Sequence, residues 1–215
     1  EDNDLISFSN NTLSDGGFIV AWYDHTVFGA NTTAAEETTG IYVQRFDNAG
    51  NSVYSSGDGA VDVRVDSDTL GVYFSSPFEV AITELSNGKV VVVWDDQSPH
   101  ADRPGDDDSY FAIQARILNA DGTPFGDQFQ VNSITHSGQR NPAITDLGSD
   151  GFIITWESDH LSTSTTSGAE TRGQRFDIAG NAEGAEFAVN SYSSDSQHSP
   201  AIASLDSGRF VVSWS

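Results

Sequence analysis

One short apolar segment that ends in tryptophan occurs four times, and this repetition constrains the fold more than any other feature. The four copies are residues 17–22 (GFIVAW), 89–94 (KVVVVW), 151–156 (GFIITW) and 209–214 (RFVVSW). They contain all four tryptophans of the 215-residue chain. A strand-sized segment that recurs at intervals of tens of residues indicates tandem structural repeats.

The third copy defines the repeating unit most clearly. Four short strands are expected at 142–147, 152–156, 172–176 and 186–190, separated by turns rich in Gly, Asp and Asn. The same template predicts strands at 78–85, 90–94, 111–117 and 128–132 in the second repeat, and at 6–9, 18–22, 41–46 and 61–65 in the first. The fourth repeat contains two strands, and no substantial helix is expected.

This pattern predicts an all-β chain of tandem four-stranded antiparallel repeats. The repeats are 1–76, 77–140, 141–198 and a truncated 199–215. Such units are typical of β-propeller blades, of which the chain would hold about 3.5; an open β-solenoid or an array of small sandwiches is the alternative. Since this is fewer blades than a propeller needs, the chain is expected to be a segment of a longer polypeptide, whose further repeats complete the fold.

The charge balance excludes several classes of partner. Nine basic and 32 acidic residues give a formal net charge of −23, which argues against nucleic acid and an anionic membrane surface. The absence of a long apolar run argues against insertion into a membrane. The chain contains no cysteine and no methionine. Strong acidity without cysteine, together with abundant Gly, Ser, Asn and Asp, indicates a bacterial protein that is secreted, extracellular or exposed on the cell surface.

Two sets of residues recur and are interpreted as structural. The tryptophans end equivalent strands, so they are expected to be buried between sheets rather than to form a glycan-stacking surface. Three arginines follow one strand later and are expected to hold neighbouring strands or loops through ion pairs or backbone hydrogen bonds. These structural repeat positions are Trp22, Trp94, Trp156, Trp214, Arg45, Arg116 and Arg175.

The loops after the tryptophans are acidic, which suggests a cation site. Calcium binds six to eight oxygen ligands from carboxylates and carbonyls, so Ca²⁺ is the expected cofactor, with solvated acidic loops as the alternative. No Asp-x-Asp-x-Asp-Gly spacing occurs. The candidate metal ligands are Asp24, Asp95, Asp96, Asp106, Asp108, Glu157 and Asp159.

The third repeat also resembles a known class of repeat. The residues that carry this resemblance are 150–156, 173–177, 180–181, Gly184 and 186–190. They resemble tandem repeats of very large, acidic, exported bacterial proteins of the RTX type, which include adhesins. The resemblance implies export, calcium dependence and a role at the surface or in the extracellular matrix, although the glycine-rich calcium nonapeptide of that class is absent.

The sequence therefore predicts a non-catalytic structural or adhesive module, stabilised by calcium, that binds a protein or glycan partner. A lectin-like glycan-binding domain is the alternative, with Tyr23 and Tyr110 as candidate ligand-binding aromatics. A glycan-active enzyme is the second alternative, because with 32 acidic residues a pair of carboxylates can lie close together. No catalytic residue is predicted, since the chain contains no nucleophile elbow, phosphate loop or dinucleotide motif.

Overall fold

The computed structural model describes residues 8–24, 40–56, 59–66, 79–96, 111–135, 138–159, 168–191 and 195–215. Within these ranges the chain forms sixteen β-strands and one 3₁₀ turn, η1 (Gly148–Asp150). No helix among these residues is long and apolar enough to cross a membrane.

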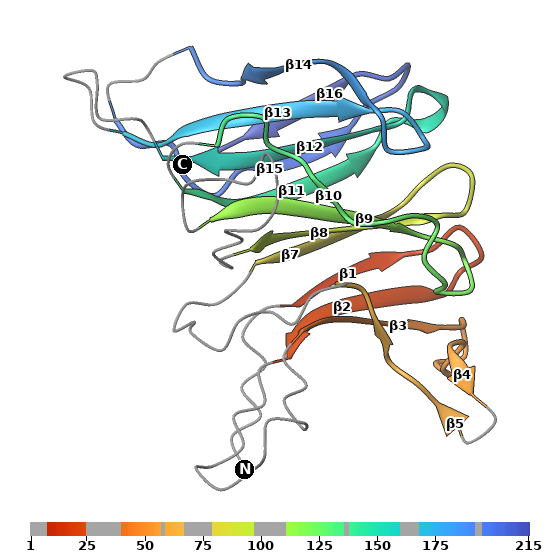
Figure 1. Ribbon diagram of the computed structural model, residues 1–215. Helices are drawn as coiled ribbons and strands as arrows, with labels where there is room; N and C mark the ends of the chain where they lie inside the picture. Colours follow the sequence, from red (N-terminus) through yellow and green to blue (C-terminus); the bar gives the residue numbers. More distant parts are fainter. Residues whose placement is uncertain are drawn as a thin grey trace, which may run out of the picture.

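Three four-stranded antiparallel sheets follow one another along the chain (Figure 1). Sheet 1 has the order β1 (Phe8–Thr12), β2 (Phe18–Asp24), β3 (Gly40–Phe46), β6 (Val63–Arg64). Sheet 2 contains β7 (Val80–Glu84), β8 (Val90–Asp96), β9 (Ala112–Leu118) and β10 (Phe129–Gln130). Sheet 3 contains β11 (Gln139–Asp146), β12 (Phe152–Ser158), β13 (Glu170–Phe176) and β14 (Ala182–Ala188).

The remaining strands form two small sheets. Sheet 4 pairs β15 (Ala201–Ser204) with β16 (Phe210–Ser213), as the truncated fourth repeat predicts. A hairpin of β4 (Ser55–Ser56) and β5 (Gly59–Ala60) was not predicted. The predicted all-β class with tandem four-stranded antiparallel sheets is thus confirmed.

The strand boundaries differ from the predictions mainly at the outer strand. In sheet 3 this strand spans 182–188 rather than 186–190, because it pairs with β13 directly after the turn at Asp177–Asn181. The outer strands of sheets 1 and 2 have only two residues each. Conversely, β8 and β12 continue two residues past their tryptophans, which places Asp95 and Glu157 inside strands rather than in loops.

The first strands of successive units lie side by side. Strand β1 lies beside β7, β7 beside β11, and β11 beside β15. One apolar cluster joins sheet 1 to sheet 2, with Ile19, Tyr23 and Trp94 among its members. A second joins sheet 2 to sheet 3. The core therefore consists of layers between sheets, so each sheet depends on its neighbours for burial of apolar area.

The tryptophans divide into two groups, which corrects the prediction that all four are buried. Trp94 and Trp156 are fully buried between sheets, whereas Trp22 is partly exposed and Trp214 is 40% exposed. The Trp156 indole donates to Gln139 Oε1 at 2.8 Å, while the buried Trp94 Nε1 has no acceptor among the described residues. Trp22 is exposed because no described sheet covers its face of sheet 1. Trp214 is exposed because sheet 4 has only two strands among the described residues, whereas sheets 2 and 3 have four.

The three arginines are not equivalent, so that prediction is also corrected. Arg45 lies opposite Ile19 and Arg175 lies opposite Ile153, but Arg116 lies opposite Val92. This difference of one residue directs Arg116 to the other face of its sheet. Arg45 donates to Ala120 O at 2.8 Å, and Arg116 donates to Val65 O at 2.7 Å.

These two arginine bonds still join neighbouring units, as the structural interpretation requires. For Arg175 the structure gives no such bond, and its buried Nε has no partner among the described residues.

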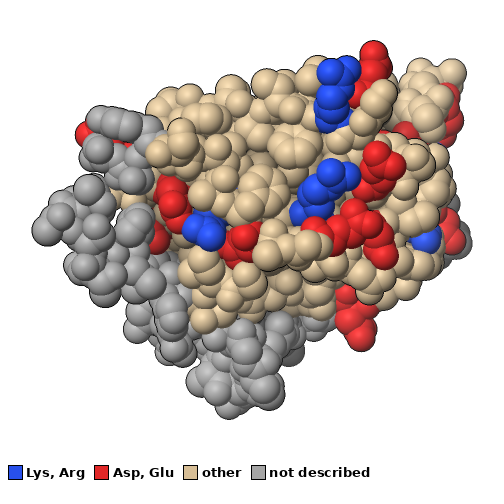
Figure 2. Space-filling view, turned by 90° about the horizontal axis from the view of Figure 1, so that it is seen from above, with Lys and Arg blue, Asp and Glu red and all other residues tan. Residues whose placement is uncertain are grey.

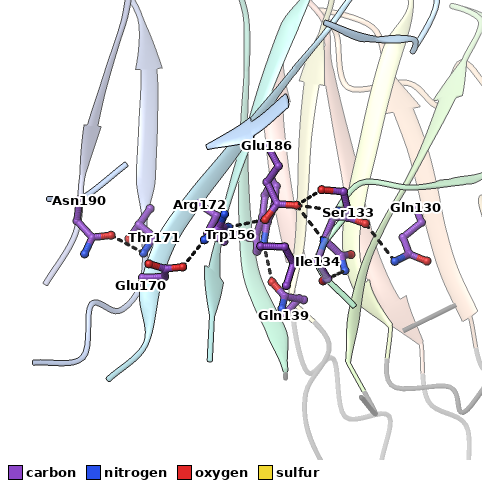
Figure 3. Close-up of polar contacts among 11 residues, drawn as sticks. Gln130, Ser133, Ile134, Gln139, Trp156, Glu170, Thr171, Arg172, Glu186 and Asn190 are labelled. Carbon is purple, nitrogen blue, oxygen red and sulfur yellow. Dashed lines mark hydrogen bonds and ion pairs between the residues drawn. The ribbon is translucent and has the colours of Figure 1, made fainter. Parts of the chain in front are cut away.

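A buried carboxylate joins sheets 2 and 3 at their outer strands (Figure 3). Glu186 Oε2 accepts hydrogen bonds from the Ser133 backbone N and Oγ, both at 2.7 Å. The other oxygen of Glu186 is ion-paired with Arg172, which also contacts Glu170. Charge-assisted bonds of this kind stabilise a contact when every partner is satisfied, so the outer edges of the two sheets are held in register.

Basic side chains lie next to acidic ones on the face drawn in Figure 2, and among the described residues drawn there they form no separate basic patch. Ion pairs among the described residues include Arg45 with Asp15 and Arg140 with Asp159. The exclusion of nucleic acid, which requires clustered Lys and Arg, stays a prediction.

Replacement of Gly151 by alanine is expected to destabilise the protein strongly. Gly151 has φ +87°, and a Cβ built there would lie 1.9 Å from the Phe176 carbonyl oxygen. Both the positive φ and the backbone clash disfavour a side chain, and we expect a loss of about 3 kcal/mol or more. Gly184 has φ +77° with nothing within 4 Å, so Gly184→Ala should cost only about 1 kcal/mol. Urea denaturation followed by circular dichroism compares the two, and equal midpoints would contradict the prediction.

Candidate functional site: two carboxyl groups bridged by Asn141

The candidate site forms around a distortion in the first strand of sheet 3. The pairing of β11 with β12 shifts register between Arg140 and Ala143. Within this bulge Asn141 adopts φ +53°, a left-handed conformation that asparagine tolerates better than most residues. Bulges redirect side chains, and here the change places Asn141 between two carboxyl groups.

A pocket opens at the bulge. It has a volume of about 230 Å³ and is lined by Glu79, Asn141, Pro142, Ser199 and Pro200. Glu79, Asn141 and Ser199 occupy the same repeat position, each two residues before the Ala-Ile of β7, β11 or β15. Because β7, β11 and β15 are neighbours, three equivalent positions with different side chains converge on one concave surface.

Asp95 is held by the backbone of two residues that line this pocket. Its side chain is almost fully buried, and Oδ1 accepts a hydrogen bond of 2.6 Å from the Glu79 backbone N. The backbone N–H of Asn141 lies near this carboxyl group and slightly lowers its pKa. Burial, reinforced by the nearby Glu79 charge and only partly offset by these hydrogen bonds, raises the pKa of Asp95 to about 7.

Glu157 is the equivalent residue in sheet 3, directly after Trp156 as Asp95 follows Trp94. It is only 4% exposed. Its Oε2 accepts a hydrogen bond of 2.8 Å from Asn141 Nδ2, and its Oε1 lies 3.0 Å from His198 Nδ1. Oε2 is thus bonded to the first strand of its own unit, and Oε1 contacts a residue just before the first strand of the next unit. These two contacts hold the carboxyl group in one orientation.

Asn141 therefore contacts both carboxyl groups, Asp95 through its backbone and Glu157 through its side chain. A hydrogen bond is about 2.9 Å long, and an asparagine reaches about 4.7 Å from N to Nδ2. The two carboxyl groups consequently lie within about 10 Å of each other. One group has a raised pKa in a buried setting, and the other is fixed by two polar partners.

The predicted metal ligands are not brought together as a group. Among the described residues, no three His, Asp or Glu side chains are arranged to hold a metal ion. Asp95 and Glu157 are near each other, whereas Asp24 belongs to sheet 1 and Asp159 is ion-paired with Arg140. Asp96 is buried at the end of β8. Asp106 and Asp108 lie outside the described residues, so a calcium site stays a prediction.

The predicted ligand-binding aromatics need one correction. Tyr23 is 1% exposed and belongs to the apolar layer between sheets 1 and 2, so it presents no ring to a glycan. Tyr23 lies on the side of β2 that faces sheet 2, and this orientation follows from strand alternation. Tyr110 lies outside the described residues.

Sequence reasoning identified Asp95 and Glu157 as acidic residues but missed the residues that join them. Asn141 and Ser199 each precede a proline in segments of ordinary composition, and His198 belongs to no motif. An alignment of the repeats on their Ala-Ile pairs could have identified two of these residues, because it places Glu79, Asn141 and Ser199 at one repeat position.

Comparisons with known proteins found matches among solved structures alone. No family model and no curated protein matches the chain. Among solved structures, it resembles "alpha-L-arabinofuranosidase from Lactobacillus brevis", with 10% identity, a TM-score of 0.47, and coverage of 95% of this chain and 63% of that one. It also resembles a "Penicillium chrysogenum alpha-L-arabinanase complexed with arabinobiose", with 14% identity, a TM-score of 0.46, and coverage of 99% and 76%.

These findings contradict the predicted function. Both solved structures are of glycan-active enzymes, so the interpretation as a non-catalytic structural or adhesive module, and with it the prediction that the chain is not an enzyme, is withdrawn. At these identities and TM-scores the likeness assigns no role to any residue of this chain. The resemblance to RTX-type repeats stays a prediction, since nothing matched tests it.

Proposed function

We propose that the chain carries a glycoside-cleaving site in which Asp95 and Glu157 act as the two carboxyl groups. The observation that supports this proposal most directly is that Asn141 contacts both groups at the edge of a pocket. In glycoside hydrolases the two carboxyl groups lie about 5 to 10 Å apart, and the separation allowed by the Asn141 bridge includes this range.

Asp95 takes the role of general acid. A carboxyl group whose pKa is about 7 is about half protonated at neutral pH and can donate its proton to the oxygen of a departing sugar. In the proposed step that proton moves to the glycosidic oxygen as the bond to the anomeric carbon breaks. Asp95 is then left as a carboxylate.

Glu157 takes the role of general base. Asn141 and His198 each bond one of its oxygens and fix the carboxyl plane, which leaves further lone pairs to accept a proton from water. The water adds its oxygen to the anomeric carbon while Glu157 accepts the proton. The net change is cleavage of one glycosidic bond by one water molecule.

We also infer that the sheets are blades of a β-propeller. The support for this is that the first strand of each unit lies beside the first strand of the next, as the inner strands of blades do around a central axis. The pocket at the start of these inner strands would then lie at one end of the axis. Its volume of about 230 Å³ fits roughly one sugar ring, since ligand pockets for larger molecules span about 300 to 1,000 Å³.

The proposal is tested with a panel of nitrophenyl pentosides and hexosides. Asp95→Asn and Glu157→Gln are each expected to lower kcat/KM by about 10² to 10⁴, the usual contribution of a general acid or base. Activity of the unaltered chain should fall as pH rises above about 7, because the acid must be protonated and its pKa is about 7.

Asp146→Asn is the matched control. Asp146 is a half-buried carboxyl at the opposite end of β11, bonded to the backbone N of Gly148 and of Ser86. Its replacement should leave kcat/KM within about twofold, since it lies far along the strand from Asn141. Full activity of Asp95→Asn would reject the acid assignment, and sugar binding without turnover in the unaltered chain would indicate a lectin instead.

A further inference from the structure

We propose that Ser199 binds a hydroxyl group of the sugar in the pocket, and that its strained backbone serves to present its side chain there. Ser199 lines the pocket together with Asn141. The inference rests on the proposed function, because it takes the pocket as the place where the sugar binds. It adds a residue that contacts the substrate but takes no part in the proton transfers assigned to Asp95 and Glu157.

Strained backbone is concentrated at this pocket. Among the described residues other than glycine, positive φ occurs at Asn141 (+53°), Ser199 (+51°) and Ser207 (+65°). Ser207 lies in the turn between β15 and β16, where left-handed residues are common. Asn141 and Ser199 instead line the pocket and occupy the same repeat position. Strain of this kind persists where the surrounding structure enforces it, and it clusters at ligand-binding sites.

The residue types at Ser199 and its neighbour make this conformation costly. Pro200 follows directly, and the residue before a proline is pushed toward an extended backbone. Serine also tolerates positive φ less well than asparagine, the residue at position 141. Glycine would adopt φ +51° without strain. The chain carries a hydroxyl group at this position instead, so the strain is explained if that hydroxyl is used.

Asn141 and Ser199 differ in what their side chains contact. The Asn141 amide donates to Glu157 at 2.8 Å and is thus used within the site. The residue equivalent to Glu157 in the fourth unit is Ser215, whose hydroxyl donates to the His198 carbonyl oxygen. Ser199 is exposed, and its hydroxyl makes no hydrogen bond within the part of the chain that the structure describes. Its one donor and two acceptor positions are therefore open to a ligand.

The rest of the pocket lining suits a sugar ring. Pro142 and Pro200 contribute apolar surface, while Glu79, Asn141 and Ser199 contribute polar groups. Sites for small molecules combine apolar walls with a few polar groups that fix the orientation of the ligand. A sugar hydroxyl both donates and accepts hydrogen bonds, and so does a serine hydroxyl. Ser199 is thus matched to one hydroxyl of the sugar ring.

Ser199→Ala tests the contact, with the nitrophenyl glycoside that the unaltered chain cleaves fastest as the substrate. It should raise KM about three- to tenfold, the usual effect of one lost hydrogen bond. The kcat should stay within about twofold, because the contact is made equally before and during bond cleavage. Ser207→Ala is the matched control, since it makes the same change at a positive φ outside the pocket lining, and its KM should not change. Ser199→Gly should raise KM as Ser199→Ala does, but with a higher midpoint of urea denaturation, because glycine fits the positive φ.

Singly deoxygenated nitrophenyl glycosides give the sharper test. For the analogue that lacks the hydroxyl bound by Ser199, Ser199→Ala should have no effect on KM, whereas the other analogues should show the full increase. An equal increase with every analogue would show a merely structural role and overturn the inference, as would an unchanged KM with the complete sugar. If the unaltered chain binds glycosides without cleaving them, the proposed cleavage fails, and dissociation constants of the same variants and analogues test Ser199. Absence of any glycoside binding would overturn both proposals.

Discussion

Asp95→Asn is expected to make the protein more stable than the unaltered chain at pH 8 while leaving the two alike near pH 4. The cause is burial, which raises the pKa of Asp95 from 3.8 to about 7 in the folded state. Between these values the folded chain holds a proton that the unfolded chain has released. Stability therefore falls as pH rises through this window, by about 1.4 kcal/mol per pH unit for a single group.

The full effect is about 4 kcal/mol over the three pH units and is complete above pH 7. Asparagine cannot ionise, so this component of the pH dependence disappears in the variant. Urea denaturation at pH 4, 5.5, 7 and 8 measures the difference in free energy of unfolding between the two chains. A constant difference across the series would show that Asp95 does not titrate in this window.

Asp177→Asn provides a control of opposite sign. Hydrogen bonds from the Asn181 side chain and from nearby backbone amides lower the pKa of Asp177. Its contribution to stability is therefore present above the unfolded pKa and is lost as pH falls through the folded value. The Asp177→Asn variant should therefore be less stable than the unaltered chain at neutral pH and similar to it in strong acid. Asp95→Asn should instead be more stable than the unaltered chain at neutral and alkaline pH.

Trp156→Ala is expected to cost about 3 to 5 kcal/mol of stability, the usual range for a buried aromatic replaced by alanine. Trp156 is fully buried between sheets 2 and 3. The variant also removes the indole N–H that donates to Gln139. Because Trp156 directly precedes Glu157 on β12, the loss of packing should disturb the candidate site as well, and kcat/KM should fall with stability.

Trp214→Ala is the matched control, since it changes the same residue at the same repeat position. Trp214 is 40% exposed, so its replacement should cost less than about 1.5 kcal/mol. Denaturation midpoints by circular dichroism compare the pair. Equal losses would mean that burial between sheets does not account for the stability that these tryptophans contribute.

The predicted strands were correct because they depend on local sequence, whereas the burial of a side chain depends on where its sheet lies among the other sheets. The strand that ends at Trp156 was predicted because apolar periodicity and turn residues act locally. The burial of Trp94 and Trp156 followed, but the exposure of Trp214 did not, because sheet 4 has only two strands among the described residues and no third or fourth strand beside this side chain. Arg116 was misplaced because a shift of one residue in strand pairing is not visible from composition.

Only part of the candidate site could be predicted from the sequence. Asp95 and Glu157 were singled out as acidic residues after equivalent tryptophans, and they were assigned to calcium. Their joint contact with Asn141 requires a bulge in β11 and a contact between units. The raised pKa of Asp95 likewise comes from burial, which depends on the packed sheets around it.

The amino-acid sequence by itself determined the repeating four-stranded unit, the turns that separate its strands and the apolar strand at its centre. These features arise from contacts between residues close in the chain, which local composition specifies. Only the tertiary structure decided which faces are covered and which carboxyl groups meet at Asn141. Those properties depend on contacts between units about sixty residues apart, and such contacts form only when several sheets pack together.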